Sequence, residues 1–103
     1  MSGAAKYIAM NRFTIHPGKG EAFEERWRDR ETFLKEVPGF IQFRLLRLDD
    51  THYSSYAEWE SEQAFKAWTN SEAFRKAHGQ GMPEGVIAGA PNLECWHVVL
   101  DGA

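Results

Sequence analysis

The sequence is poor in the features that mark secreted, membrane-spanning and nucleic-acid-binding proteins. Its only cysteine is Cys95, which excludes an internal disulfide and a cysteine-based zinc cluster and fits a reducing compartment. No basic run occurs, and the formal net charge is −3 with both signs interspersed, so a nucleic-acid partner is not expected. The N-terminus lacks the apolar core of a signal peptide, and no apolar run has the length of a membrane span. These absences predict a cytoplasmic protein with no membrane partner.

Aromatic residues, by contrast, are abundant. They make up 14% of the 103 residues and include seven Phe and four Trp, while the hydrophobic share of 43% and the charged share of 26% are ordinary for a globular protein. A chain of this length suffices for one domain that folds without disulfides or structural metals. We therefore expect residues 1–103 to form a single domain whose aromatic side chains fill a core and line a pocket.

A first strand is predicted over residues 6–16. One face of this strand is apolar except for a single carboxamide, and it holds Tyr7, Ala9, Asn11, Phe13 and Ile15. A buried carboxamide without hydrogen-bond partners costs about 1 to 3 kcal/mol. Asn11 is therefore either a structural hydrogen-bonding residue or a group that is held ready for a ligand.

The order of the predicted elements indicates the fold class. Helical spacing predicts a helix over 21–35, with a buried stripe formed by Phe23, Trp27, Phe33 and Leu34. Alternating patterns and turn residues predict the other elements: strands over 40–48, 52–59 and 93–100, and helical structure over 61–78. This order is that of an α+β protein with the ferredoxin-like split βαβ topology, in which helices cover one face of a four-stranded antiparallel sheet.

The other face of the predicted sheet is also apolar. We assign to it large side chains from three strands: Ile8, Met10, Ile41, Phe43, Leu45, Trp96, Val98 and Leu100. An apolar face needs a cover, and the chain has no further element to supply it. Packing two copies sheet to sheet would supply it, so the pattern predicts a two-fold homodimer that forms a dimeric α/β barrel.

The helical stretch from Ala64 to His78 contains two similar apolar stripes. The first ends on Trp68 and the second on His78, and Asn70 or Ser71 can cap a new helical turn between them. The stretch is therefore two short helices or one kinked helix. Trp68 is either a core residue or the wall of a cofactor pocket, and His78 is either a neutral histidine at a helix end or a ligand of a metal or cofactor.

A glycine-rich segment follows from Gly79 to Asn92. It shows no helical or strand period, which predicts a long irregular loop of the kind that often forms the rim of a pocket. The remaining histidines, His16, His52 and His97, are expected at strand ends or on exposed faces, and we assign them no chemistry.

Several phrases of the sequence together resemble one family. They are Met10-Asn11-Arg12-Phe13, Pro17-Gly18-Lys19-Gly20, Pro38-Gly39-Phe40, Trp59-Glu60-Ser61 and the run Ala64 to His78. Over nearly the whole chain they are similar to the IsdG-type heme-degrading monooxygenases of the antibiotic biosynthesis monooxygenase, or dimeric α/β barrel, superfamily. The combination of Asn, Trp and His at these places is the most specific part of the likeness.

The resemblance implies a role for each of these three residues. His78 would be the axial ligand of heme iron, Trp68 would pack against the porphyrin and distort it, and Asn11 would donate a hydrogen bond near the oxygen site. The apolar wall of the pocket would come from Phe23, Trp27, Phe65 and Phe74. Arg75 and Lys76 are candidates for contact with the heme propionates.

The implied activity is that of a heme oxygenase. Heme would be both substrate and cofactor, without a flavin, and dioxygen with an external electron donor or reductase would open the ring to a linear tetrapyrrole and free iron. Three alternatives remain open on the sequence. They are a cofactor-free monooxygenase of phenols or quinols in the same superfamily, a heme carrier or sensor without turnover, and a barrel with no ligand.

Overall fold

The computed structural model of the chain describes residues 5–30, 34–78 and 85–102, with Ala77 and His78 described in their backbone only. Its elements, in chain order, are β1 (Tyr7–Thr14), α1 (Gly20–Asp29), the 3-10 helix η1 (Leu34–Glu36), β2 (Phe40–Asp49), β3 (His52–Trp59), α2 (Glu62–Thr69), α3 (Glu72–His78) and β4 (Asn92–His97). The four strands form one antiparallel sheet in the order β2-β3-β1-β4. The predicted ferredoxin-like topology is confirmed.

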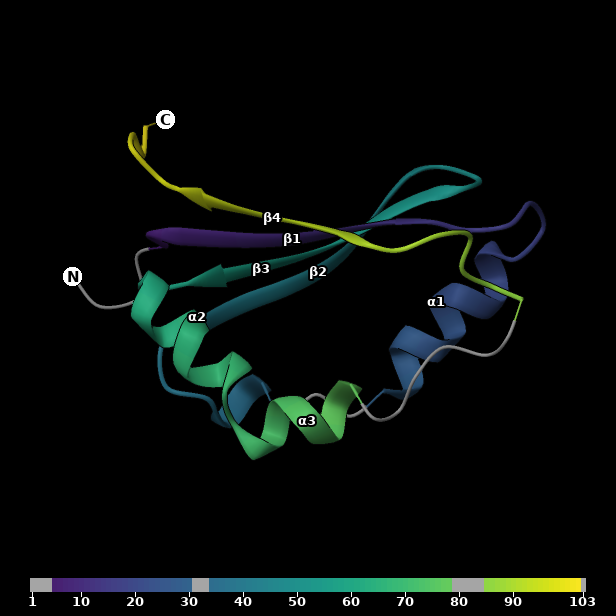
Figure 1. Cartoon of the computed structure of the whole chain (residues 1–103). Coiled ribbons are helices and arrows are strands. Elements are labelled where there is room, and N and C mark those ends of the chain that lie inside the picture. Colours follow the sequence, from purple (N-terminus) through teal and green to yellow (C-terminus); the bar gives the residue numbers. More distant parts are fainter. Residues whose placement is uncertain (1–4, 31–33, 79–84, 103) are drawn as a thin grey trace.

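The helices lie on one side of the sheet (Figure 1). α1 lies beneath one end of the sheet, α2 lies beneath the other end, and α3 lies between them. The alternation of β1 decides which of its side chains they cover, because successive residues of a strand point to opposite faces. Tyr7, Ala9, Phe13 and Ile15 are buried, as the sequence predicts.

Among the described residues, two clusters make up the core beneath the sheet. One gathers around Phe23, which is fully buried, and Phe13, with Trp27 packed against it. The other gathers around Trp59, also fully buried, and includes Leu34, with Phe65 and Trp68 packed against it. α1 therefore contributes side chains to the first cluster, and η1 and α2 contribute side chains to the second.

The first helix ends earlier than the sequence predicts. α1 stops at Asp29 instead of residue 35, and Arg30 has an extended backbone with φ −76° and ψ 127°. Leu34 lies in η1 and packs in the second cluster, while Phe23 and Trp27 pack in the first. One straight helix could not place these three side chains in both clusters. Tertiary packing therefore ends the helix before the point that the helical spacing of the sequence predicts. Phe33, assigned to the same stripe, lies outside the described residues.

The assignment of Phe43 and Leu45 to the uncovered face is wrong. Phe43 pairs with Ala57, and its ring stacks on Trp27 with centroids 5.4 Å apart, so it lies on the covered face. Leu45 packs against the first core cluster on the same side. The cause is a register irregularity between Phe40 and Gln42, which shifts the alternation of β2 by one residue.

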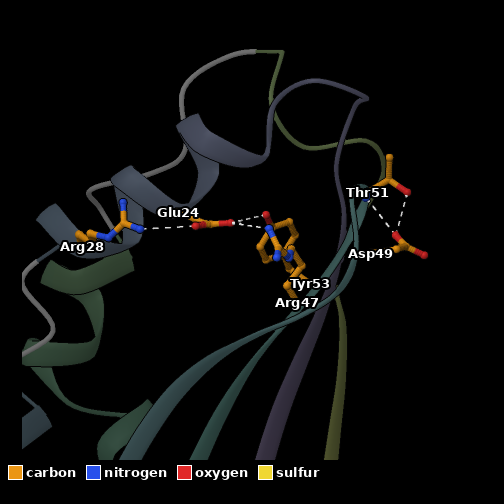
Figure 2. A network of polar contacts seen from close by, with 6 residues as sticks. All are labelled: Glu24, Arg28, Arg47, Asp49, Thr51 and Tyr53. Carbon is orange, nitrogen blue, oxygen red and sulfur yellow. Dashed lines mark hydrogen bonds and ion pairs between the residues drawn. The ribbon is translucent and has the colours of Figure 1, made fainter.

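A polar network ties α1 to the far end of the β2–β3 hairpin (Figure 2). The Tyr53 hydroxyl donates to Oε2 of Glu24, and Arg47 lies 3.8 Å from the same oxygen. Burial and the Glu24 carboxylate raise the pKa of Tyr53, so the phenol stays a donor. At the turn, Asp49 accepts a hydrogen bond of 3.0 Å from the backbone N–H of Thr51. Through Glu24, Tyr53 and Arg47 the network joins α1 to the hairpin.

Within the described part of the chain, no helix has the length and apolar character needed to cross a membrane.

Candidate functional site

A cavity of about 330 Å³ lies between the sheet and the helices. Its floor is formed by short side chains on the two central strands, Ala9 and Asn11 of β1 and Ser55 and Ala57 of β3. Large residues at these positions would fill the space, so the cavity exists because the sequence places small ones there. The volume lies within the usual range for small-molecule sites.

Aromatic rings form two walls above this floor. On the α1 side, Trp27 and Phe43 stack on each other. On the opposite side, Phe65 and Trp68 of α2 and Phe74 of α3 line the cavity. Trp68 and Phe74 meet edge to face, with centroids 4.8 Å apart at 86°. The cavity is therefore a slot whose walls offer ring faces to a flat apolar ligand.

Two serine caps position the second wall. The backbone N–H of Ala64 donates to Oγ of Ser61 at 3.1 Å, and the backbone N–H of Phe74 donates to Oγ of Ser71 at the same distance. The first cap begins α2 and the second begins α3. The predicted helical stretch is thus two helices, with Ser71 as the cap of the second, and together they bring Trp68 and Phe74 into contact.

Asn11 faces the cavity from the middle of the sheet. It is half-buried, and it lies directly opposite Ser55 in the pairing of β1 with β3. Among the described residues, neither the Asn11 carboxamide nor the Ser55 hydroxyl takes part in a side-chain hydrogen bond. Of the two interpretations left open by the sequence, the absence of a structural partner favours a group held ready for a ligand.

The cavity has one charged side chain among the described residues that line it, Arg30. Its guanidinium carbon lies 4.7 Å from the centroid of the Trp27 ring, which is a cation–π contact. Burial and, to a lesser degree, the neighbouring charge of Arg26 lower the pKa of Arg30. A guanidinium remains protonated in proteins, so the cavity contains a positive charge.

Tyr7 lies in the core cluster next to this second wall, 5.7 Å from the Phe65 ring. A hydrogen bond with the Cys95 side chain, together with burial, raises the pKa of Tyr7 to about 12. The phenol is neutral at physiological pH and serves as a core residue.

The predicted site residues fall into three groups in the structure. Asn11, Trp27, Phe65, Trp68 and Phe74 line the cavity together. Phe23 does not line it, because this side chain is fully buried behind the wall, with its ring 5.3 Å from Phe13 and 6.2 Å from Trp27.

His78 forms the third group. Its backbone is the last residue of α3, whereas its side chain lies outside the described residues, as do residues 79–84 of the glycine-rich segment. Beyond them, Ile87 and Pro91 line the cavity, so this segment contributes to the pocket as predicted. The role of His78 stays a prediction.

A larger and more open groove of about 1010 Å³ lies on the other side of Trp68. The described residues that line it include three carboxylates, Glu36, Glu60 and Glu72, and one cation, Lys76. Lys76 lies 3.8 Å from Glu72 and lines this groove instead of the cavity. The carboxylates outnumber the cation in this groove, so its charge disfavours an anionic ligand. The smaller, apolar cavity is therefore the better candidate site. Arg75, the other predicted contact, lines neither space.

Sequence reasoning missed three polar residues of the cavity, Arg30, Ser55 and Thr69. Arg30 reads as part of the charged outer face of a helix, and it is turned toward the cavity only because α1 ends at Asp29. Ser55 reads as one of several polar residues in a strand. The pairing of β1 with β3 is the signal that places it beside Asn11.

The remaining histidines lie where the sequence predicts. His16, His52 and His97 are all exposed, at or next to strand ends. Nδ1 of His52 lies 2.8 Å from Oδ1 of Asp49, and this hydrogen bond is the main cause that lowers the pKa of Asp49.

The chain is similar to known oxygenases over most of its length. It is 35% identical over 96 residues to a heme oxygenase (mycobilin-producing) of Mycobacterium tuberculosis, which covers 91% of this chain and 90% of that protein. Its fold is similar to that of MhuD, a heme-degrader of Mycobacterium tuberculosis solved with two hemes bound in its active site. The TM-score is 0.75 at 31% identity, covering 94% of this chain and 99% of that chain.

The same fold occurs in an oxygenase of another kind. SnoaB, a cofactor-independent oxygenase from Streptomyces nogalater, matches with a TM-score of 0.71 at 22% identity over 95% of this chain and 97% of that chain, a likeness of fold alone. Residues 6–80 match the antibiotic biosynthesis monooxygenase family, which spans well over half of the sequence. On this match, the chain belongs to the antibiotic biosynthesis monooxygenase family.

Proposed function

We propose that this protein is a heme-degrading monooxygenase. It would bind heme as its substrate in the cavity and use dioxygen and electrons from an external donor to open the ring, releasing iron and a linear tetrapyrrole. One observation carries the proposal: Asn11, Trp68 and Phe74, from three separate elements, line one apolar cavity in a chain that is 35% identical to a heme oxygenase.

The described residues of the cavity fit such a ligand. The walls are aromatic and the floor is lined by short side chains, which suits a flat macrocycle. The indole Nε1 of Trp27 is buried and has no hydrogen-bond acceptor within the described part of the chain. Unpaired buried donors are costly, and a ligand with acceptor atoms would relieve this cost.

Each side chain would have a separate task. When bound, heme supplies the iron at which dioxygen is activated and the ring that is oxidised. His78, from the end of α3, would hold the iron and fix the side that stays open. Trp68 would press on the macrocycle from the α2 wall, and the Asn11 carboxamide would donate a hydrogen bond to negative charge that develops above the floor. The two aromatic walls would exclude water.

A hemin titration followed by absorbance tests the proposal. We expect a saturable Soret band that bleaches on addition of ascorbate with catalase, with released iron and a bilin-like product. His78→Ala should shift the band and slow degradation at least about tenfold, since the loss of outer-shell partners alone costs that much at metal sites. His16→Ala, which changes an exposed histidine outside the cavity, is the control and should match the parent.

Each other outcome points to one of the alternatives. A stable Soret band in the presence of reduced iron would indicate a carrier or sensor. The absence of a saturable band would refute the heme proposal and make a phenol or quinol the next substrate to test, as in a cofactor-free oxygenase. A His78→Ala spectrum identical to that of the parent would remove His78 from the iron.

We also propose that the uncovered face of the sheet is the interface of a homodimer. Ile8 lies directly opposite Trp96, and Met10 lies opposite Tyr56, on the face away from the helices. Trp96 is 54% exposed, which is unusual for an indole in a strand. Sedimentation should give twice the chain mass for the parent and the chain mass for Trp96→Lys, whereas a monomeric parent would contradict the dimer.

We further propose that the protein is located in the cytoplasm, because its single cysteine, Cys95, fits a reducing compartment.

A further inference from the structure

Ser55 is a polar side chain of the cavity floor to which the scheme above gives no task. It lies in the middle of β3 on the same face as Tyr53, Ala57 and Trp59, because alternate residues of a strand share a face. Tyr53 and Trp59 are buried in the two core clusters, and Ala57 lines the floor beside Ser55. The Ser55 hydroxyl therefore lies in a cavity whose lining is mostly apolar.

The other described serines use their hydroxyl groups within the fold. Oγ of Ser54 donates to the carbonyl oxygen of Ser55 at 2.9 Å. Oγ of Ser61 and Oγ of Ser71 accept the cap hydrogen bonds of α2 and α3, and Oγ of Ser71 also donates to the carbonyl oxygen of Trp68 at 2.6 Å. Ser55 is the exception, because its half-buried hydroxyl has no hydrogen bond to a described residue. Such a group needs a partner from water or from a ligand.

Ser55 and Asn11 lie side by side on the floor. They are directly opposite each other in the pairing of β1 with β3, and side chains in this relation have Cβ atoms about 4.5 to 5.5 Å apart. No hydrogen bond joins the two side chains, although each of them can donate one. Two donors at this spacing can both reach one acceptor atom between them, since a hydrogen bond spans about 3 Å between heavy atoms. The floor therefore offers a site with two donors, one from each central strand.

We propose that Ser55 is a catalytic residue that donates a hydrogen bond, together with Asn11, to negative charge that develops above the floor. This inference rests on the proposed function, in which dioxygen is used within the cavity. Donors that are already in place stabilise developing charge most strongly where water is excluded, and a second donor adds to the effect of the first. A serine suits this task because its short side chain loses little conformational freedom when it is ordered.

The hydroxyl of Ser55 must be separated from its small size, because its neighbours on the floor, Ala9 and Ala57, are also small. If only size matters, threonine and valine at this position should behave alike, since the two side chains have nearly the same shape. If the hydroxyl matters, only threonine should replace serine. Both side chains are β-branched and suit a strand. The comparison of Ser55→Thr with Ser55→Val therefore isolates the hydroxyl.

The test uses hemin-loaded protein and two measurements besides the affinity for hemin. One is the affinity of the ferric form for fluoride, an anion that binds iron and accepts hydrogen bonds, measured by absorbance titration without reductant. The other is the rate of Soret bleaching at saturating hemin. The variants are Ser55→Ala, Ser55→Thr and Ser55→Val. The control is Ser54→Ala, which removes a hydroxyl from the opposite face of β3. Circular dichroism and thermal unfolding check the fold of each variant.

We expect Ser55→Ala and Ser55→Val to bind hemin with an affinity within a few-fold of the parent. Both should bind fluoride about tenfold more weakly and degrade hemin about tenfold more slowly, which is the effect of one lost hydrogen bond to a charged group. Ser55→Thr and Ser54→Ala should match the parent in all three measurements. If Ser55→Ala does not fold, the comparison of Ser55→Thr with Ser55→Val is the test.

Other results would overturn the inference. Unchanged fluoride affinity or an unchanged bleaching rate in Ser55→Val would show that the hydroxyl is not a donor in this site. Equal losses in Ser55→Thr and Ser55→Val would assign Ser55 to the shape of the floor. In both cases a parent that binds and degrades hemin leaves the proposed function intact. A parent that shows no saturable binding of hemin would overturn the proposed function itself.

Discussion

Asn11→Ala should bind hemin with an affinity within a few-fold of the parent and degrade it about a hundredfold more slowly. The estimate follows from the loss of one preorganised hydrogen-bond donor, which costs about 10² to 10³ in rate where charge develops in a reaction. The effect falls on turnover because Asn11 is a small part of the cavity surface, which is otherwise mostly apolar. The rate of Soret bleaching at saturating hemin measures it.

The structure makes this a clean substitution. The Asn11 backbone is paired on both sides, to Ser55 of β3 and Leu93 of β4, and β1 already contains alanine at position 9 on the same face. No side-chain hydrogen bond of Asn11 to a described residue is lost, so the free energy of unfolding should change little. Thr14→Ala, on the opposite face of the same strand, is the control for strand stability.

A second variant separates the donor from the size of the side chain. Asn11→Asp preserves the shape but offers no N–H when it is ionised, so it should be as slow as Asn11→Ala. Normal turnover by both variants would remove Asn11 from the mechanism. Weak hemin binding by both would instead make it a binding residue.

Gly39→Ala should lower the free energy of unfolding by about 2 to 5 kcal/mol. Gly39 has φ +85°, a left-handed conformation that costs a residue with a Cβ about 1 to 2 kcal/mol. A Cβ at this position would also lie 2.4 Å from the Cβ of Ala64 in α2. Overpacking of this kind costs about 1 to 3 kcal/mol. The backbone cannot easily move away, because the Gly39 carbonyl accepts a hydrogen bond of 2.8 Å from the N–H of Glu60.

Two further variants divide this cost into its parts. Gly18 has φ +80° with no atom within 4 Å of an added Cβ, so Gly18→Ala carries the conformational cost alone, about 1 to 2 kcal/mol. In an Ala64→Gly background the steric part of the Gly39→Ala cost should disappear. Urea unfolding is measured for the parent, Gly18→Ala, Gly39→Ala, Ala64→Gly and the double variant. Equal costs at Gly18 and Gly39 would show that α2 yields to the extra methyl group.

The sequence predicts the sheet better than the helices that flank it. The alternation of β1 places Tyr7 and Phe13 correctly, because every residue on that face of the strand except Asn11 is buried. The same alternation gives the wrong face for part of β2. The register irregularity near Ile41 shifts the alternation by one residue, and nothing in the sequence pattern marks it. Likewise, no Pro or Gly marks the end of α1 at Asp29. The helix ends there because Leu34 packs in a different cluster from Trp27, and that is a tertiary cause.

The candidate site divides in the same way. Asn11, Trp68 and Phe74 could be predicted to line the pocket, because each breaks or completes a local pattern. Arg30 and Ser55 could not, since they become part of the cavity only through the end of a helix and the register of two strands. Phe23 lies behind the wall instead of in it, because helical spacing tells which side of a helix is buried and not how deeply each side chain is buried.

The two serine-capped helices of the second wall also affect the order in which parts of the chain fold during synthesis. α2 has eight residues and α3 has seven, and helices of fewer than about 12 residues are marginal in water without tertiary support. Trp68 packs in a cluster with buried side chains from β1, η1 and β3, all of which precede α2 in the chain. During synthesis, we therefore expect the wall that holds Trp68 to become stable once these earlier elements have been made and have packed together.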